Sequence, residues 1–345
     1  MANANRNSSI ELLRILAAAG VVILHYNSLD AGGAFAAAKG AGLYSLIFLE
    51  SLFICAVNLF IMISGYFLSA SEIRKPSKVI MLFLQVILFN AAFYALGLFT
   101  GARSFSFTEF VYALLPRNYF AVLYCTLYIF SKYINIILDK LDKKGFKKLL
   151  ILMFCVFSVL TAVLDETGLL FNIDMTGLSP IALLGSGEGY TIVNFVLMYV
   201  IGAYIRRYGA EIKTGTAALA AAGSLAAVFL RAAAGMYFTG NFGAAFNYNN
   251  PFVIVFAAFA LTLASKANFG CKAINELSGA AFTCFLFHTA LIPYFKIEWA
   301  AEHNAAILVI HALLCSLAAY LISYVVYKIY SFIISPVNKL VKKMD

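Results

Sequence analysis

Two ionisable side chains, Arg14 and His25, share one apolar stretch at residues 8–26 (SSIELLRILAAAGVVILHY). They are eleven positions apart, which at about 100° per residue puts both on one helix face, about 16 Å apart along its axis. A charge inside a membrane helix costs roughly 3 kcal/mol, and a histidine suits proton transfer near neutral pH. Arg14 is therefore either an interfacial anchor and His25 a headgroup-layer residue, or the two face the interior of a helix bundle and form the wall of a site.

The composition indicates which elements must position these residues. The chain has 345 residues, of which 63% are hydrophobic and only 12% charged, and its mean hydropathy is +0.89. Such a chain is a polytopic membrane protein, and its apolar runs lack the alternation of a β-barrel. We expect an all-α transmembrane helical bundle that forms a single domain over residues 1–345.

About ten membrane spans are expected from the apolar runs. The expected spans are residues 10–30, 43–69, 78–99, 111–131, 147–164, 190–206, 215–235, 251–266, 279–297 and 304–334.

The loop charges predict how these spans are oriented. Lys and Arg gather in alternate loops, at Arg6 and in residues 74–78, 140–148, 206–213, 266–272 and 339–343. The intervening loops hold few Lys and Arg and carry Asp165, Glu166, Asp174, Glu188, Glu298 and Glu302. This pattern obeys the positive-inside rule and predicts that both termini are cytoplasmic. The orientation of the loops therefore explains the net charge of +9, which does not indicate nucleic-acid binding. We expect membrane lipids and no nucleic acid as partners.

The chain carries no pattern typical of a metal or disulfide framework. Its six cysteines are scattered, mostly inside apolar runs, where they read as small buried hydrophobes. We expect no metal site and no bound cofactor. Ser8 and Glu11 are expected to form a capping box that opens a permanent helix, which argues against a cleaved signal peptide.

The second expected span contains a polar segment, residues 57–68 (VNLFIMISGYFL). A Ser-Gly pair in a membrane helix is typical of close helix packing, and Asn58 needs a hydrogen-bond partner across the bundle. The alternative is that Asn58, Ser64 and Tyr66 donate hydrogen bonds to an oxyanion during catalysis.

Taken together, these motifs resemble the acyltransferase-3 family of bacterial integral membrane O-acyltransferases, in the stand-alone form without an extracytoplasmic SGNH domain. Arg14 and His25 match its first-helix signature, and the SGY segment matches its second-helix motif. Residues 123–130 (LYCTLYIF) are similar to a fourth-helix segment, without its usual Trp, and residues 285–288 (FLFH) to a late Y-x-x-H segment. The resemblance runs from about residue 8 to about residue 330.

The resemblance implies an O-acyltransferase of the bacterial plasma (inner) membrane. It would move an acyl group, with acetyl as the first expectation, from acyl-CoA to a hydroxyl of a cell-surface or exopolysaccharide glycan or its lipid-linked precursor. His25 would act as general base, with Arg14 as the second catalytic residue. The residues expected to bind the oxyanion or support the site are Asn58, Ser64, Tyr66 and His288.

A basic cluster follows the SGY segment at Arg74, Lys75 and Lys78. It is either a positive-inside anchor in contact with headgroups or a clamp for the phosphates of acyl-CoA. The family often carries Arg-x-x-Arg here, so this chain matches in charge and not in spacing.

Two intervening loops, residues 165–190 and 236–250, are the expected outer loops. The second interleaves aromatic residues with asparagines. Such a loop is either an interfacial aromatic belt or a surface that stacks against sugar rings and hydrogen-bonds their hydroxyls.

Two other functions compete with acyl transfer. A transporter of a glycan or small anion could use buried Arg14 and His25 for coupling, although no internal repeat is visible. A polysaccharide polymerase or ligase would carry large basic outer loops, which this chain lacks. Of the remaining histidines, His303 is expected to be solvated and His311 to pack in the core without a polar companion.

Overall fold

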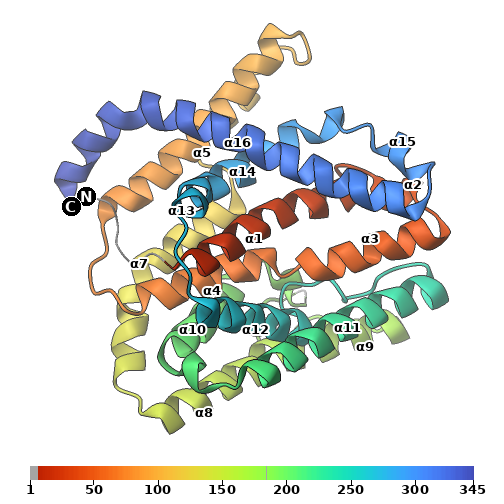
Figure 1. Cartoon of the computed structure of the whole chain (residues 1–345), viewed down its shortest axis with the longest axis vertical. Helices are drawn as coiled ribbons and strands as arrows, with labels where there is room; N and C mark the ends of the chain where they lie inside the picture. The colour runs from red at the N-terminus through yellow and green to blue at the C-terminus, as the bar shows by residue number, and fades with distance from the viewer. Residues whose placement is uncertain (1–6, 184) are drawn as a thin grey trace. The chain divides into compact units, whose positions relative to one another are not determined.

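The computed structural model describes residues 7–183 and 185–345, and its regular structure is helical apart from one isolated bridge between Ala182 and Gly185 (Figure 1). The all-α class expected from the composition is confirmed. Seven helices of the described chain are long and apolar enough to cross a membrane. They are Ser8–Asn27, Gly40–Leu68, Pro76–Phe99, Tyr119–Asp139, Lys143–Phe171, Thr214–Thr239 and Ala305–Met344.

The three other expected spans are shorter or broken. α10 (Ile192–Tyr208) and α12 (Pro251–Ala267) have 17 residues each. The ninth expected span consists of α14 (Ala281–Phe287) followed by two 3-10 turns, the second of which contains Pro293. The count of ten spans and the cytoplasmic termini stay predictions.

The described chain divides into two compact units. The first unit comprises residues 7–70 and 141–325 and the second comprises residues 71–140 and 326–345. The long helix α16 (Ala305–Val341) contributes to both. Whether the whole chain acts as a single domain stays a prediction.

The helix α1 (Ser8–Asn27), drawn red in Figure 1, organises the first unit. It contacts α3 (Gly40–Phe53), α4 (Ala56–Leu68), α12, α13 (Lys272–Leu277) and α14. The remaining helices of this unit are α2 (Ala34–Ala37), α8 (Lys143–Phe154), α9 (Leu160–Phe171), α10, α11 (Thr214–Thr239) and α15 (Ile297–Ala301).

The start of α1 differs from the expected capping box. The N-cap residue is Asn7, whose side chain accepts a hydrogen bond from the backbone N–H of Ser9. Ser8 is already inside the helix, and its hydroxyl donates to Asn275 Oδ1 at 2.8 Å. The capping box with Ser8 as N-cap was therefore wrong, because the amide of Asn7 satisfies the first-turn N–H one residue earlier.

Two glycines allow α4 and α10 to cross closely. A Cβ atom at Gly65 would overlap the carbonyl oxygen of Tyr199, and a Cβ atom at Gly202 would overlap that of Met62. The helices therefore meet backbone to backbone, as small residues permit in membranes. This confirms close packing as a role of the SGY glycine.

The second unit is built on α5 (Pro76–Phe99), α6 (Phe107–Ala113), α7 (Tyr119–Asp139) and the end of α16. The last residue, Asp345, accepts hydrogen bonds from the backbone N–H (3.1 Å) and hydroxyl (2.8 Å) of Ser77 in the first turn of α5. The C-terminus is thereby attached to an element 268 positions earlier in the chain.

Candidate active site

The structure brings His25 of α1 and His288 into contact. Their ring centroids lie 4.6 Å apart and the rings meet edge to face at 74°. His288 is 2% exposed and begins the 3-10 turn that follows α14. Two imidazoles from segments 263 positions apart thus share one place inside the first unit.

The hydrogen bonds of the two rings fix which nitrogen carries the proton. Nδ1 of His25 lies 3.0 Å from the carbonyl oxygen of Val21, and Nδ1 of His288 lies 2.9 Å from that of Cys284. A carbonyl oxygen only accepts, so both Nδ1 atoms donate, and Nε2 of each neutral ring is a free lone pair. Nε2 of His288 is buried without a partner among the described residues. Two basic nitrogens are therefore available at this contact.

Arg14, the other expected catalytic residue, is ion-paired on its own helix. Its Nη1 donates to Oε2 of Glu11 at 2.5 Å, and the two side chains are 23% and 1% exposed. The arginine is therefore held in place by a buried carboxylate. Its catalytic role stays a prediction.

Asn58 lies in a buried polar network that joins three segments. Its side-chain amide donates to the carbonyl oxygen of Tyr248 at 2.8 Å, and its Oδ1 accepts from the amide of Asn194 at 3.3 Å. These contacts favour the interhelical hydrogen bond over the oxyanion role, which stays a prediction.

Ser64 and Tyr66, the other candidates on α4, make different contacts. The Ser64 hydroxyl donates to the carbonyl oxygen of Phe60 one turn earlier, at 2.9 Å. The Tyr66 hydroxyl accepts from Nη1 of Arg206 at 3.2 Å, and the guanidinium lies 5.0 Å from the Tyr66 ring centre. Tyr66 thus positions an arginine that the sequence indicated only as a topology signal.

Tyr66 and Arg206 border a cavity of about 810 Å³ in the first unit. Its wall is completed by Asn7, the end of α10 and the connection from α12 to α13. This volume lies within the range of ligand pockets, roughly 300–1,000 Å³. Sequence reasoning missed this cavity because its residues come from four separate segments.

The basic cluster after α4 is engaged within the second unit. Arg74 Nε donates to the Ser131 hydroxyl at 2.6 Å, and Lys75 Nζ lies 3.2 Å from Oδ2 of Asp345. Lys78 Nζ lies 4.7 Å from the ring centre of Tyr128. These contacts are all made inside the protein, so the anchoring role and the role in binding acyl-CoA both stay predictions.

His311 on α16 has a polar companion, contrary to expectation. Its Nδ1 lies 2.8 Å from the hydroxyl oxygen of Tyr26, and the sulfur of Cys315 lies 3.7 Å from the same ring. The partner comes from another helix, so the periodicity of residues 304–334 could not reveal it.

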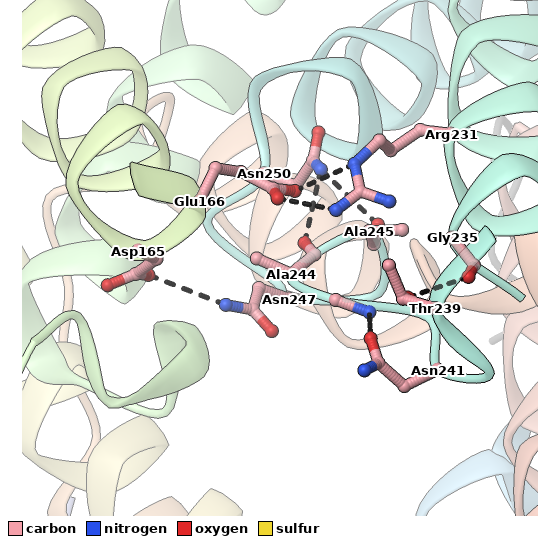
Figure 2. A network of polar contacts seen from close by, with 11 residues as sticks. Asp165, Glu166, Arg231, Gly235, Thr239, Asn241, Ala244, Ala245, Asn247 and Asn250 are labelled. Carbon is pink, nitrogen blue, oxygen red and sulfur yellow. Dashed lines mark hydrogen bonds and ion pairs between the residues drawn. The ribbon is translucent and has the colours of Figure 1, made fainter. Parts of the chain in front are cut away.

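The asparagines of residues 236–250 are largely used inside the protein. Asn247 donates to Asp165 at 3.4 Å, and Asn250 donates to two carbonyl oxygens of its own loop at 3.3 Å each. Figure 2 shows these contacts as dashed lines. Beside them, Arg231 of α11 forms a two-bond ion pair with Glu166 of α9, with lengths of 3.1 and 2.5 Å. The ion pair joins α11 to α9, and the bond from Asn247 joins residues 236–250 to α9. The engaged asparagines leave fewer amide groups for a sugar than the sequence suggested.

Exposed aromatic side chains also belong to this region. Tyr237 and Phe238 are 74% and 79% exposed, as suits an interfacial belt, whereas Phe242 packs against Phe35 with ring centres 4.6 Å apart. The belt therefore explains part of the aromatic pattern and internal packing another part.

Comparison with known families identifies the class of protein to which this site belongs. The acyltransferase-3 family model, described as an acyltransferase domain, matches residues 7–328. The chain therefore belongs to this family of acyltransferases and is an O-acyltransferase, which decides against the transporter and polymerase hypotheses. Searches of curated proteins and of solved structures each found no match.

Proposed function

We propose that this membrane O-acyltransferase transfers an acyl group, with acetyl as the first candidate, from acyl-CoA to a hydroxyl of a cell-surface glycan or its lipid-linked precursor. The family match supports the reaction class. The single observation that carries the mechanism is the contact between His25 and His288, in which Nδ1 of each ring is engaged and Nε2 is a free base.

His25 acts as the general base in this proposal. Its Nε2 takes the proton of the acceptor hydroxyl while the hydroxyl oxygen bonds to the thioester carbonyl carbon. The carbon–sulfur bond then breaks, and the CoA thiolate takes up the proton from the imidazolium. The products are an ester and free CoA. His288 supports this step, because its Nε2 is a second buried acceptor beside His25.

The donor and acceptor are expected on opposite sides of a bacterial plasma membrane. The loop charges put Arg14 towards the cytoplasmic end of α1 and His25 in its outer half. The rise between the two residues is about 16 Å, so the arm of acyl-CoA would pass Arg14 to present its thioester to His25. A covalent acyl-enzyme relay is the alternative route.

Transfer from labelled donor is the direct experiment. Membranes that contain the protein receive acetyl-CoA with a radiolabelled acetyl group, and label is sought in glycan. His25→Ala should lower transfer about 100- to 10,000-fold without loss of folded protein. The matched control is His303→Ala, because His303 makes the same Nδ1 bond to a carbonyl one turn earlier, at 2.7 Å. Near-full transfer by folded His25→Ala would overturn the proposal.

The cluster of Arg74, Lys75 and Lys78 remains a proposed binding site for the phosphates of acyl-CoA. Its positive charge supports this role. Replacing all three residues with Gln should raise the KM for the donor more than the KM for the acceptor. An unchanged donor KM in a folded triple variant would leave only the anchoring role.

A further inference from the structure

The cavity of about 810 Å³ in the first unit is lined by cations and amides. Arg206 and Lys272 supply positive charge, and Asn7, Asn268 and Asn275 supply amide groups. Among the described residues that line it, none is acidic. A cavity with this lining selects for a polar, negatively charged ligand.

The two cations are available to a ligand. Arg206 donates to the Tyr66 hydroxyl through Nη1 and has no ion pair with an acid among the described residues, so most of its five N–H donors remain. Lys272 has no polar side-chain partner among the described residues and is exposed. Arginine and lysine with unsatisfied donors are the side chains that bind phosphate groups.

We propose that this cavity, as the alternative to the cluster at Arg74, Lys75 and Lys78, binds the phosphate groups at the nucleotide end of the acyl donor, with Arg206 and Lys272 as the charged ligands. This inference rests on the proposed function and names where the donor is held. The cavity belongs to the same unit as His25, and both lie along α1. From Asn7 to His25 the helix rises about 27 Å, so the donor lies extended along it with its thioester at the far end.

Binding of the isolated nucleotide end tests the proposal without acyl transfer. Adenosine 3′,5′-bisphosphate and desulfo-CoA are titrated calorimetrically into purified protein in nanodiscs of neutral phosphatidylcholine. Arg206→Gln and Lys272→Gln should each weaken both ligands about tenfold to a hundredfold, as for a lost charge-assisted hydrogen bond, and affinity should fall with added salt.

Matched variants distinguish binding of the nucleotide in the cavity from a general effect of positive charge on its affinity. Lys213→Gln removes an exposed cation of the same expected face that does not line the cavity, so it should bind both ligands as the wild type does. Arg206→Lys keeps the charge next to Tyr66 and should recover part of the loss. Equal affinity of wild type and Lys272→Gln, a substitution at an exposed position, would overturn the proposal.

The same titration distinguishes a nucleotide from a lipid headgroup, which also carries phosphate. Nanodiscs with phosphatidylglycerol should leave the affinity for adenosine 3′,5′-bisphosphate nearly unchanged. Complete loss of nucleotide binding in these discs would assign the cavity to anionic lipid and overturn the proposal.

The failures of the two proposals are distinguishable. If the wild type transfers acetyl from acetyl-CoA but the Arg206 and Lys272 variants keep the donor KM, the cavity assignment is wrong and the acyl transfer stands. If the nucleotide binds as expected but no acyl group reaches glycan from any CoA thioester, the proposed reaction is wrong and the phosphate site stands.

Discussion

At the scale of single residues, the local hydrogen bonds determine what each histidine can do. His25 bonds Val21 and His288 bonds Cys284, each through Nδ1 to a carbonyl one turn earlier. Both rings are thereby held as the tautomer whose Nε2 accepts a proton. The backbone carbonyl of the preceding turn orients each imidazole, so no aspartate is needed for that purpose.

The contribution of His288 should differ from that of His25. His288→Ala should lower kcat less than His25→Ala does, because the base itself remains, and it should shift the pH dependence of kcat because a neighbouring ring is lost. Steady-state rates between pH 5 and 9 measure both effects. A His288→Ala enzyme with an unchanged rate and pH profile would limit His288 to packing.

Variants of Arg14 and Glu11 can separate the contribution of this ion pair to stability from its contribution to acyl transfer. Arg14→Ala should nearly abolish transfer and should also lower stability, by roughly 3 kcal/mol, because the buried Glu11 loses its counter-charge. The double variant Glu11→Gln with Arg14→Gln should recover stability but not transfer. Melting temperature and label transfer, measured on the same preparations, separate the two effects; recovery of transfer in the double variant would argue against a catalytic Arg14.

The sequence alone indicated His25 and Arg14 as candidate site residues, because their spacing and their charge are properties of a single helix. The spacing of eleven residues and the cost of burying charge are local facts. The contact with His288, the Tyr26–His311 pair and the role of Tyr66 beside Arg206 depend on how separate helices pack, which periodicity does not encode. Arg206 was visible only as part of a basic loop.

At the scale of elements, apolar length predicted most helices, whereas breaks in helices were missed. The expected span 78–99 corresponds to α5 at Pro76–Phe99, with Pro76 at the first helical turn. The expected span 43–69 is divided at Ile54 and Cys55 into α3 and α4, where no Pro or Gly signals a break. The expected span 279–297 is interrupted, because α14 already ends at Phe287 and Pro293 lies in a later 3-10 turn.

The crossing of α4 and α10 should be sensitive to one added methyl group. Gly65→Ala and Gly202→Ala each place a Cβ against a backbone carbonyl of the other helix, so each should lower stability by about 1–3 kcal/mol. Gly223→Ala on α11 has no atom within 4 Å of the new Cβ and should be neutral or gain up to about 1 kcal/mol. Melting temperatures in detergent measure the difference, and three equal values would contradict the close crossing.

The attachment of the C-terminus should depend on pH. The hydrogen bond from the Ser77 hydroxyl, together with the nearby Lys75 ammonium, lowers the pKa of Asp345 below its usual range. The attachment of Asp345 to Ser77 is therefore at full strength above the ordinary carboxyl pKa of about 3.9. It is lost as the pH falls through the lower pKa that Asp345 has in the folded protein. Hydrogen exchange at the Ser77 amide, corrected for intrinsic rates, should be slow at pH 6 and faster near pH 3. Asp345→Asn should lose most of this pH dependence.

At the scale of the whole molecule, the orientation in the membrane is the main open prediction. The alternation of basic loops predicts that both termini and residues 206–213 face the cytoplasm and that residues 236–250 lie outside. A phosphatase reporter fused after Gly240 should be active in the periplasm of a bacterial host, and one fused after Asp345 should be inactive, with a cytoplasmic fluorescent reporter showing the reverse. An extracytoplasmic signal after Asp345 would refute this topology and the direction of donor entry.

The glycine crossing has a consequence for how the chain can vary. Gly65 is followed by Tyr66, and Gly202 lies four positions before Arg206, so the crossing sets the Tyr66–Arg206 pair at the cavity. A genetic screen for weak donor binding should therefore recover substitutions at both glycines alongside those of the cations. Second-site revertants should not arise at Tyr199 or Met62, because the atoms in the way are carbonyl oxygens that every residue carries. A substitution of Gly65 or Gly202 therefore cannot be compensated by a second substitution at the residue that it contacts.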